Sequence, residues 1–195
     1  MKASLLIIAT LCSFIGTTDY VLSILKGKTR PHRTTRVVLF LVSICNFIGT
    51  LATHAHLGIL LLAIFFFGRS LLLALLSIKK GVGGTSRLDI TCAVVAIVGI
   101  GAWLFTGSGI WALIFAILAD AVAYVPAVVK TWKLPKSEAP LLYLMEGIAA
   151  LLAIAHDGWR SSVVFQAYIV LSCIVMLVCI YRPTFGSERT AAPLE

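Results

Sequence analysis

The sequence predicts an all-α polytopic membrane protein, with seven transmembrane helices arranged as two parallel three-helix repeats joined by a linker helix. Hydrophobic residues make up 60% of the chain and charged residues only 12%, whereas a soluble domain carries about 45–50% and about 25%. The apolar residues form seven continuous runs, each near the length of about 20 residues that a helix needs to cross a bilayer. Lysines and arginines gather after every second run, as an odd number of spans requires.

The seven runs set the boundaries of the predicted parts of the chain. The predicted spans are residues 3–25, 36–54, 57–78, 88–106, 110–132, 139–156 and 161–181. They define a first three-helix unit (1–79), a linker with the fourth helix (80–109), a second three-helix unit (110–182) and a tail (183–195). Segment 81–86 is rich in glycine and is expected to be a flexible linker between the two units.

A short pattern at the end of the first span recurs at the end of the fifth. The repeated residues are Tyr20, Val21, Lys26 and Pro31 in the first copy and Tyr124, Val125, Lys130 and Pro135 in the second. The apolar runs that follow each copy also begin at nearly the same offset. Internal repeats of this kind are typical of membrane transporters.

The positive charges predict the orientation of the chain. They lie in the loops after the first, third and fifth spans and in the tail, and such loops face the cytoplasm. We therefore expect an integral protein of the inner or plasma membrane, with the N-terminus outside and the C-terminus in the cytoplasm. The net charge of +8 follows from this rule. It indicates anionic lipid headgroups on the cytoplasmic face as partners and no nucleic acid.

Three ionisable residues lie deep inside the predicted spans: Arg69, Asp120 and Glu146. Each would cost about 2.5–3.5 kcal/mol if it faced lipid at mid-membrane, so all three should face the protein interior or a water-filled cavity. Arginine keeps its charge in proteins, so we expect Arg69 to pair with Asp120 or Glu146. Such a pair could hold helices together only, or it could be part of a functional site.

The repeat places a second acid near Asp120. Asp19 falls one helical turn from Asp120 on the equivalent helix, on the same face. With one arginine and three acids, at least one carboxylate stays free to bind a cation or carry a proton. Asn46 and Tyr124 are further candidates for substrate binding or coupling. Pro126 removes a backbone donor from its helix, which predicts a kink or a hinge beside this site.

The sequence contains no motif for a cofactor, a metal or a catalytic residue, so we expect none of the three and no enzyme activity. Its cysteines, which all lie inside predicted spans, are Cys12, Cys45, Cys92, Cys173 and Cys179. Buried cysteine in an apolar helix behaves as a small hydrophobic residue. His54 and His56 are interpreted as a pair at the membrane interface rather than a metal site.

The three-one-three layout, Pro126 in the first helix of a repeat, and the exit through Lys130, Thr131 and Trp132 resemble the PQ-loop and SWEET transporter superfamily. Ala127 stands where the family has glutamine, and Leu22 stands where the first repeat has proline. The resemblance implies transport of a small polar metabolite by alternating access, either as uniport or linked to protons. It is also compatible with a homo-oligomer. The alternative is a receptor of the same fold that binds a ligand without conducting it.

Overall fold

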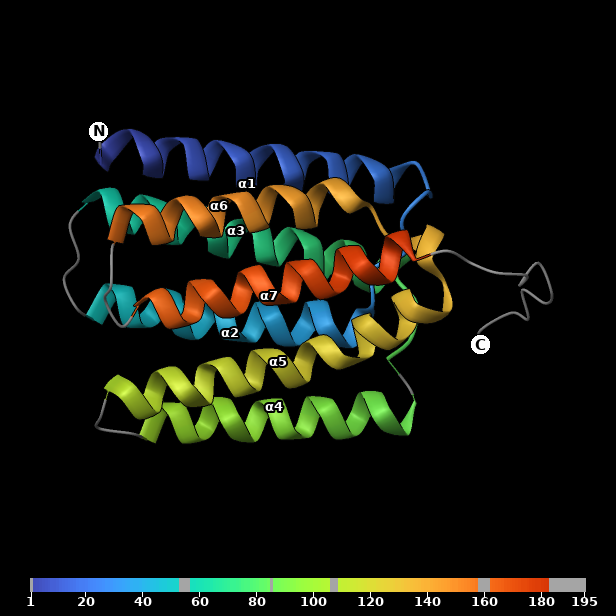
Figure 1. Cartoon of the computed structure of the whole chain (residues 1–195). Helices are drawn as coiled ribbons and strands as arrows, with labels where there is room; N and C mark the ends of the chain where they lie inside the picture. The colour runs from blue at the N-terminus through green and yellow to red at the C-terminus, as the bar shows by residue number, and fades with distance from the viewer. Residues whose placement is uncertain (1, 53–56, 85, 106–108, 158–161, 183–195) are drawn as a thin grey trace. The chain divides into compact units, whose positions relative to one another are not determined.

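The computed structural model describes residues 2–52, 57–84, 86–105, 109–157 and 162–182. These residues form seven α-helices and one 3-10 turn, with an isolated β-bridge and no strand among them (Figure 1). The helices are α1 (Lys2–Leu25), α2 (Arg33–Ala52), α3 (Leu57–Lys80), α4 (Arg87–Phe105), α5 (Gly109–Lys133), α6 (Pro140–Asp157) and α7 (Ser162–Tyr181), and the turn η1 is Pro135–Ser137.

The predicted all-α fold with seven helices is confirmed. Each predicted span coincides with one helix, and the ends differ by only a few residues. Two helical segments, Ser4–Leu25 and Val163–Tyr181, are long and apolar enough to cross a membrane, and Pro140–His156 is a shorter apolar helix. Crossing of the membrane by all seven helices stays a prediction.

The chain divides into two compact units. We call Met1–Arg30 together with Val128–Glu195 the terminal unit, and Pro31–Ala127 the central unit. The terminal unit contains α1, α6 and α7 with the end of α5, and the central unit contains α2, α3, α4 and most of α5. Helix packing therefore groups the helices differently from the predicted units 1–79 and 110–182. The sequence repeat itself stays a prediction.

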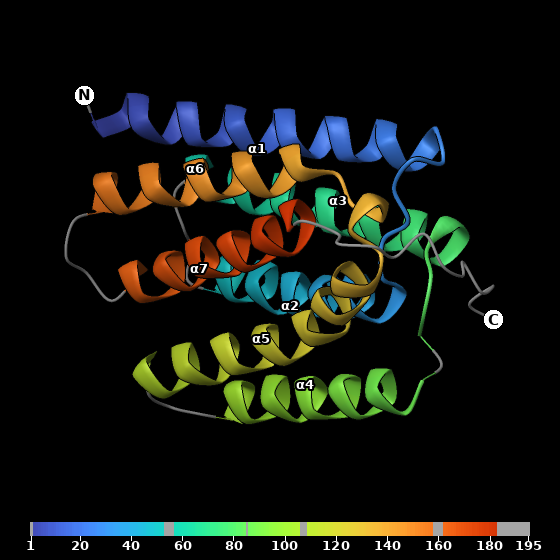
Figure 2. The same ribbon diagram turned by 45° about the vertical axis from the view of Figure 1, so that its right-hand side comes forward.

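In the terminal unit, α6 packs against both α1 and α7. Figures 1 and 2 show α1 running alongside α6 in both views. Gly16 marks the close approach of these two helices, because a Cβ atom there would lie 2.9 Å from the Cβ of Met145 and 3.3 Å from the Cα of Leu142. The missing side chain of Gly16 thus allows α1 and α6 to approach each other.

We expect Gly16→Ala to destabilise the protein by about 1–3 kcal/mol, the usual result of overfilling a packed interface. Gly68→Ala is the matched control, since Gly68 also lies in a helix but nothing stands within 4 Å of its added Cβ. Thermal unfolding of both variants tests this. Equal thermal unfolding midpoints for the two variants would show that α1 and α6 can move apart without a loss of stability.

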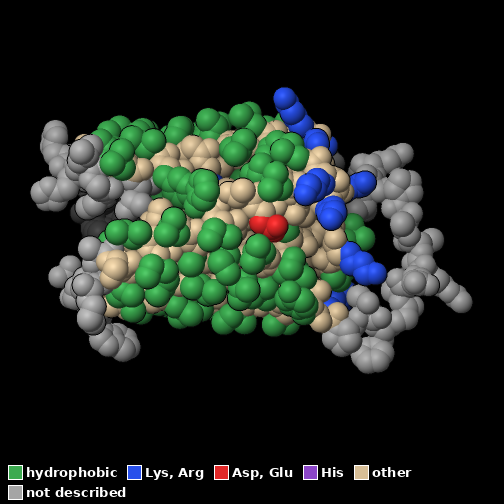
Figure 3. Space-filling view, turned by 90° about the horizontal axis from the view of Figure 1, so that it is seen from above, with side chains coloured by type: hydrophobic (Ala, Val, Ile, Leu, Met, Phe, Trp, Pro, Cys, Tyr) green, Lys and Arg blue, Asp and Glu red, His purple; other side chains and the backbone are tan. Residues whose placement is uncertain are grey.

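Helix α1 exposes a row of large apolar side chains. They include Ile7, Leu11, Phe14, Ile15 and Leu22, each about half exposed. In the view onto α1, hydrophobic side chains cover most of the face, and the lysines and arginines in view gather at one end (Figure 3). Soluble monomers rarely expose apolar surface this extensive.

Segment 81–84 in the central unit is more ordered than the sequence indicated. The Val82 N–H donates to the Pro31 carbonyl oxygen at 2.9 Å, and the Arg33 N–H donates to the Val82 carbonyl oxygen at 3.1 Å. Both flanking helices, α3 and α4, belong to the same compact unit. Backbone hydrogen bonds thus hold the segment against the start of α2, which the sequence did not indicate, and its role as a linker between two three-helix units stays a prediction.

Candidate functional site

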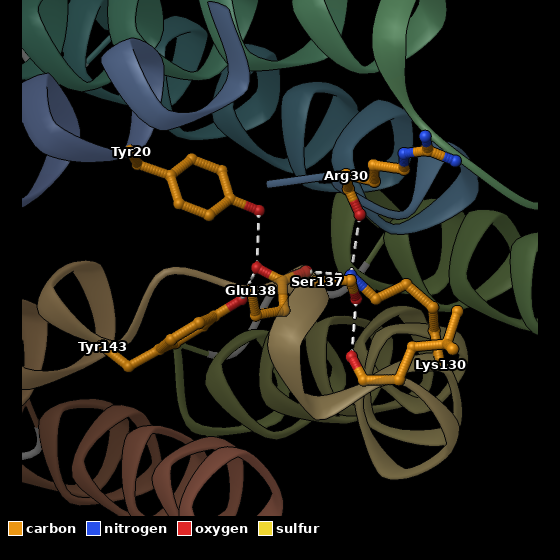
Figure 4. A network of polar contacts seen from close by, with 7 residues as sticks. Tyr20, Arg30, Lys130, Ser137, Glu138 and Tyr143 are labelled. Carbon is orange, nitrogen blue, oxygen red and sulfur yellow. Dashed lines mark hydrogen bonds and ion pairs between the residues drawn. The ribbon is translucent and has the colours of Figure 1, made fainter. Parts of the chain in front are cut away.

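A buried carboxylate, Glu138, lies at the centre of a polar network in the terminal unit (Figure 4). The hydroxyl groups of Tyr20 and Tyr143 both donate to its Oε2 atom, at 2.9 Å and 3.1 Å. The ammonium group of Lys130 forms an ion pair with its Oε1 atom. Both oxygens of the carboxylate therefore have protein partners.

Three of the four side chains come from neighbouring segments of the chain, and the fourth, Tyr20, is 118 residues from Glu138. Tyr20 is on α1, Lys130 is in the last turn of α5, and Tyr143 is in the first turn of α6. Glu138 follows η1 in an extended conformation. Pro135 cannot continue α5, because its ring clashes with the preceding turn. The turn that it starts directs Glu138 back toward Lys130.

The network is almost fully shielded from solvent. The side chains of Lys130 and Glu138 are 5% and 1% exposed, and both tyrosines are buried. An isolated charge at such a position would cost several kcal/mol, so two charges persist there only as a well-bonded pair. This arrangement pairs a buried cation with a buried anion. Its chemistry is to neutralise charge and to fix geometry.

The same network includes residues next to both points where the chain passes from one unit to the other. Arg30, the last residue before the central unit, accepts a hydrogen bond from Lys130 Nζ at 2.7 Å and donates its N–H to the Ser137 carbonyl oxygen at 2.9 Å. Lys130 itself follows closely after Val128, where the chain returns. Within the terminal unit, Lys130 therefore connects the segment that leads to the central unit with the segment that returns from it.

A second buried polar pair lies in the central unit. His32 Nε2 is 3.2 Å from Asp89 Oδ1, and both side chains are buried. Asp89 Oδ2 accepts the N–H groups of Gly84 at 2.8 Å and Ser86 at 3.2 Å, while Ser86 Oγ accepts the Asp89 N–H at 3.1 Å. The reciprocal bonds of Ser86 and Asp89 form a capping box at the start of α4. An acid in the first turn of a helix is also favoured by the positive end of the helix dipole.

The predicted site residues are distributed over both units. Asp19 and Glu146 belong to the terminal unit, and Asn46, Arg69, Asp120, Tyr124 and Pro126 belong to the central unit. Asp120 and Pro126 are buried, and the other described side chains are partly buried. The side chain of Asn46 lies outside the described residues. A common cavity for this set stays a prediction.

Arg69 has one neighbour that the sequence did not indicate. Its guanidinium carbon lies 5.2 Å from the ring centroid of Phe66, one helical turn earlier on α3. An arginine over an aromatic face gains a cation–π attraction, which is stronger where water is excluded. The predicted partners Asp120 and Glu146 belong to different units, and the pairing of Arg69 with either stays a prediction.

The network around Glu138 has no clear signature in the sequence. The sequence pattern singles out Tyr20 as a repeated residue and Lys130 as a repeated residue at the exit of its span, but it does not single out Glu138. Glu138 follows Lys133 and Lys136 in the sequence, a composition typical of a solvated loop. The one available signal was that a lone acid stands in a loop of lysines.

Comparisons with protein-family models, with curated proteins and with solved structures gave no match. Among the residues that the structure describes, no group of three or more His, Cys, Asp or Glu side chains could hold a metal ion. Function is therefore argued from the geometry of the two units and from the buried charges.

Proposed function

We propose that this protein is a polytopic membrane transporter that moves a small polar metabolite by alternating access. The observation that carries the proposal is the way its two compact units are connected. The chain crosses between them after Arg30 and again after Ala127. The second crossing lies within α5, one residue beyond Pro126. Alternating access needs two bodies that reorient about a small number of connections.

Pro126 makes the crossing in α5 a weak point. Proline has no N–H, so the carbonyl group of Val122 loses its usual helical hydrogen bond, and the ring also clashes with that carbonyl. Helix α5 nevertheless continues to Lys133 on the other side. A helix that spans two compact units with one interrupted hydrogen bond at their boundary is suited to bend there.

The apolar exterior supports a place in the membrane. Helix α4 exposes Ile90, Val94, Ile97 and Val98, and α7 exposes Val164, Leu171, Ile174 and Val178. Taken with the exposed row on α1, such faces would be costly in water, at roughly 25 cal/mol for each Å² of apolar surface. The charge distribution then favours an outside N-terminus and a cytoplasmic C-terminus.

Asp120 is the best candidate for binding or coupling. It is 6% exposed and lies on α5 ahead of Pro126. A carboxyl group inside an apolar membrane helix is costly, and groups of this kind mark ion pathways and proton relays. A change in proton or substrate occupancy at Asp120 would act on the same helix that bends at Pro126.

Uptake into proteoliposomes tests the proposal. With a panel of small polar metabolites, we expect the wild-type protein to take up at least one compound. We expect Asp120→Asn to fold normally but to lose uptake or its pH dependence. Asp19→Asn is the matched control, because Asp19 lies nearer the predicted cytoplasmic surface, and a smaller effect is expected. Ligand binding without flux would favour the receptor alternative, and normal uptake by Asp120→Asn would leave that residue a packing role.

A further inference from the structure

We infer that the terminal unit carries a binding surface for acidic phospholipid headgroups, formed by loop residues 26–30 and 132–137. We call this the basic loop surface. The inference rests on the proposed membrane location but not on transport. It concerns a particular surface on one unit, rather than the general excess of positive charge on one side of the protein.

Every exposed charge on these two loops is positive. The exposed cations are Lys26, Lys28, Arg30, Lys133 and Lys136. None of their side chains forms an ion pair with another described residue. The one acid of the two loops and their immediate neighbours, Glu138, points inward and is neutralised by Lys130. Burial of that carboxylate leaves the outer surface without a competing negative charge.

The two loops are held rigidly and side by side. Helix α1 ends in a Schellman motif, in which the Gly27 N–H donates to the Ile24 carbonyl oxygen and the Lys28 N–H to the Ser23 carbonyl oxygen. Gly27 has the positive φ of 72° that this motif requires. The hydrogen bond from Arg30 N–H to Ser137 then joins one loop to the other.

The Arg30 side chain extends away from Glu138 while its carbonyl group faces Lys130 (Figure 4). The backbone of Arg30 thus belongs to the buried network, and its guanidinium group is left for the outer surface. Because the loops are already ordered, binding would cost little additional conformational entropy.

Aromatic side chains next to the cations identify the partner as a bilayer. Trp132 is 52% exposed at the end of α5, and Tyr181 is 70% exposed at the end of α7. The guanidinium group of Arg182 lies 4.0 Å from the Trp132 ring centroid and also donates to the Trp132 carbonyl oxygen. Tryptophan and tyrosine concentrate at the level of the headgroups. A soluble phosphate could pair with the cations, but it would leave these rings in water.

The test uses a protein in which Trp132 is the remaining tryptophan. The other tryptophans, replaced by Phe, are Trp103, Trp111 and Trp159. This protein is reconstituted in bilayers of equal parts phosphatidylglycerol and phosphatidylcholine, with bromine high on the acyl chains of one lipid or the other. We expect brominated phosphatidylglycerol to quench Trp132 fluorescence more strongly than brominated phosphatidylcholine. The preference should decrease with added salt, because exposed charges are screened.

A matched pair of variants locates the effect. Lys28→Gln with Lys133→Gln should reduce the preference for phosphatidylglycerol by roughly tenfold, since each cation near an anionic surface contributes separately. The control is Lys79→Gln with Arg87→Gln, which removes two exposed cations of the central unit and should change the preference little.

Equal quenching by the two lipids in the parent protein would overturn the inference. An equal loss in both double variants would also overturn it, since the effect would then be one of total charge. Loss of the preference on adding millimolar inorganic phosphate, at constant ionic strength, would assign the surface to soluble phosphate instead. Failure of the protein to insert into bilayers at all would count against the proposed function. A reconstituted, transporting protein without lipid preference would refute the basic loop surface alone.

Discussion

Lys130→Met is expected to destabilise the protein by about 3–5 kcal/mol, the usual cost of removing one member of a buried ion pair. The variant would leave the Glu138 carboxylate, now 1% exposed, without its counter-charge. It would also remove the hydrogen bond from Lys130 Nζ to the Arg30 carbonyl oxygen. Thermal or denaturant unfolding in detergent measures the loss.

A double-mutant cycle separates the pair from its surroundings. Glu138→Gln keeps the shape of the side chain and an oxygen that can accept from Tyr20 and Tyr143, so Lys130→Met with Glu138→Gln should recover much of the stability. Lys133→Met is the matched control at the same helix end, where the side chain is exposed, and it should change stability by no more than about 0.5 kcal/mol. Strictly additive losses in the double variant would mean that the pair has no energetic coupling.

The helices could be predicted from the sequence because their signals are local. Runs of apolar residues of membrane-spanning length, ended by breakers such as Gly27 and Pro135, set both their number and their approximate ends. Each of these conclusions depends on residues that are near one another in the chain.

The Glu138 network could not be predicted in this way. Tyr20 lies on α1 and Glu138 lies in the short segment between η1 and α6, and the hydrogen bond between them spans a separation of 118 residues. In the sequence, Lys130 is one of several lysines at the cytoplasmic end of a predicted span. Its pairing depends on η1, which reverses the chain so that a residue eight positions later faces it. The order of segment 81–84 was missed for the same reason, since its partner Pro31 belongs to a distant loop.

The Gly81 contacts predict a second large effect. A Cβ atom at Gly81 would lie 2.2 Å from the Ser77 carbonyl oxygen and 2.6 Å from the Pro31 carbonyl oxygen. Both neighbours are backbone atoms, so no side-chain rotation can relieve the contact. The Pro31 oxygen also accepts the Val82 N–H at 2.9 Å. Any shift that accommodates the new methyl group would therefore strain the link between segment 81–84 and the start of α2.

We accordingly expect Gly81→Ala to destabilise the protein by about 3 kcal/mol, at the upper end of the usual cost of overpacking. The control is Gly101→Ala, in α4, where nothing lies within 4 Å of the added Cβ. It should be neutral, or stabilising by up to about 1 kcal/mol, because alanine favours a helix.

Trypsin provides a local measurement, since Lys80 and Arg87 are exposed on either side of the segment. Cleavage there should be faster in Gly81→Ala, because release of the segment exposes its backbone to the protease. If Gly81→Ala and Gly101→Ala had the same unfolding midpoint and the same cleavage rate, the loop would accommodate the methyl group and keep its hydrogen bonds to the start of α2.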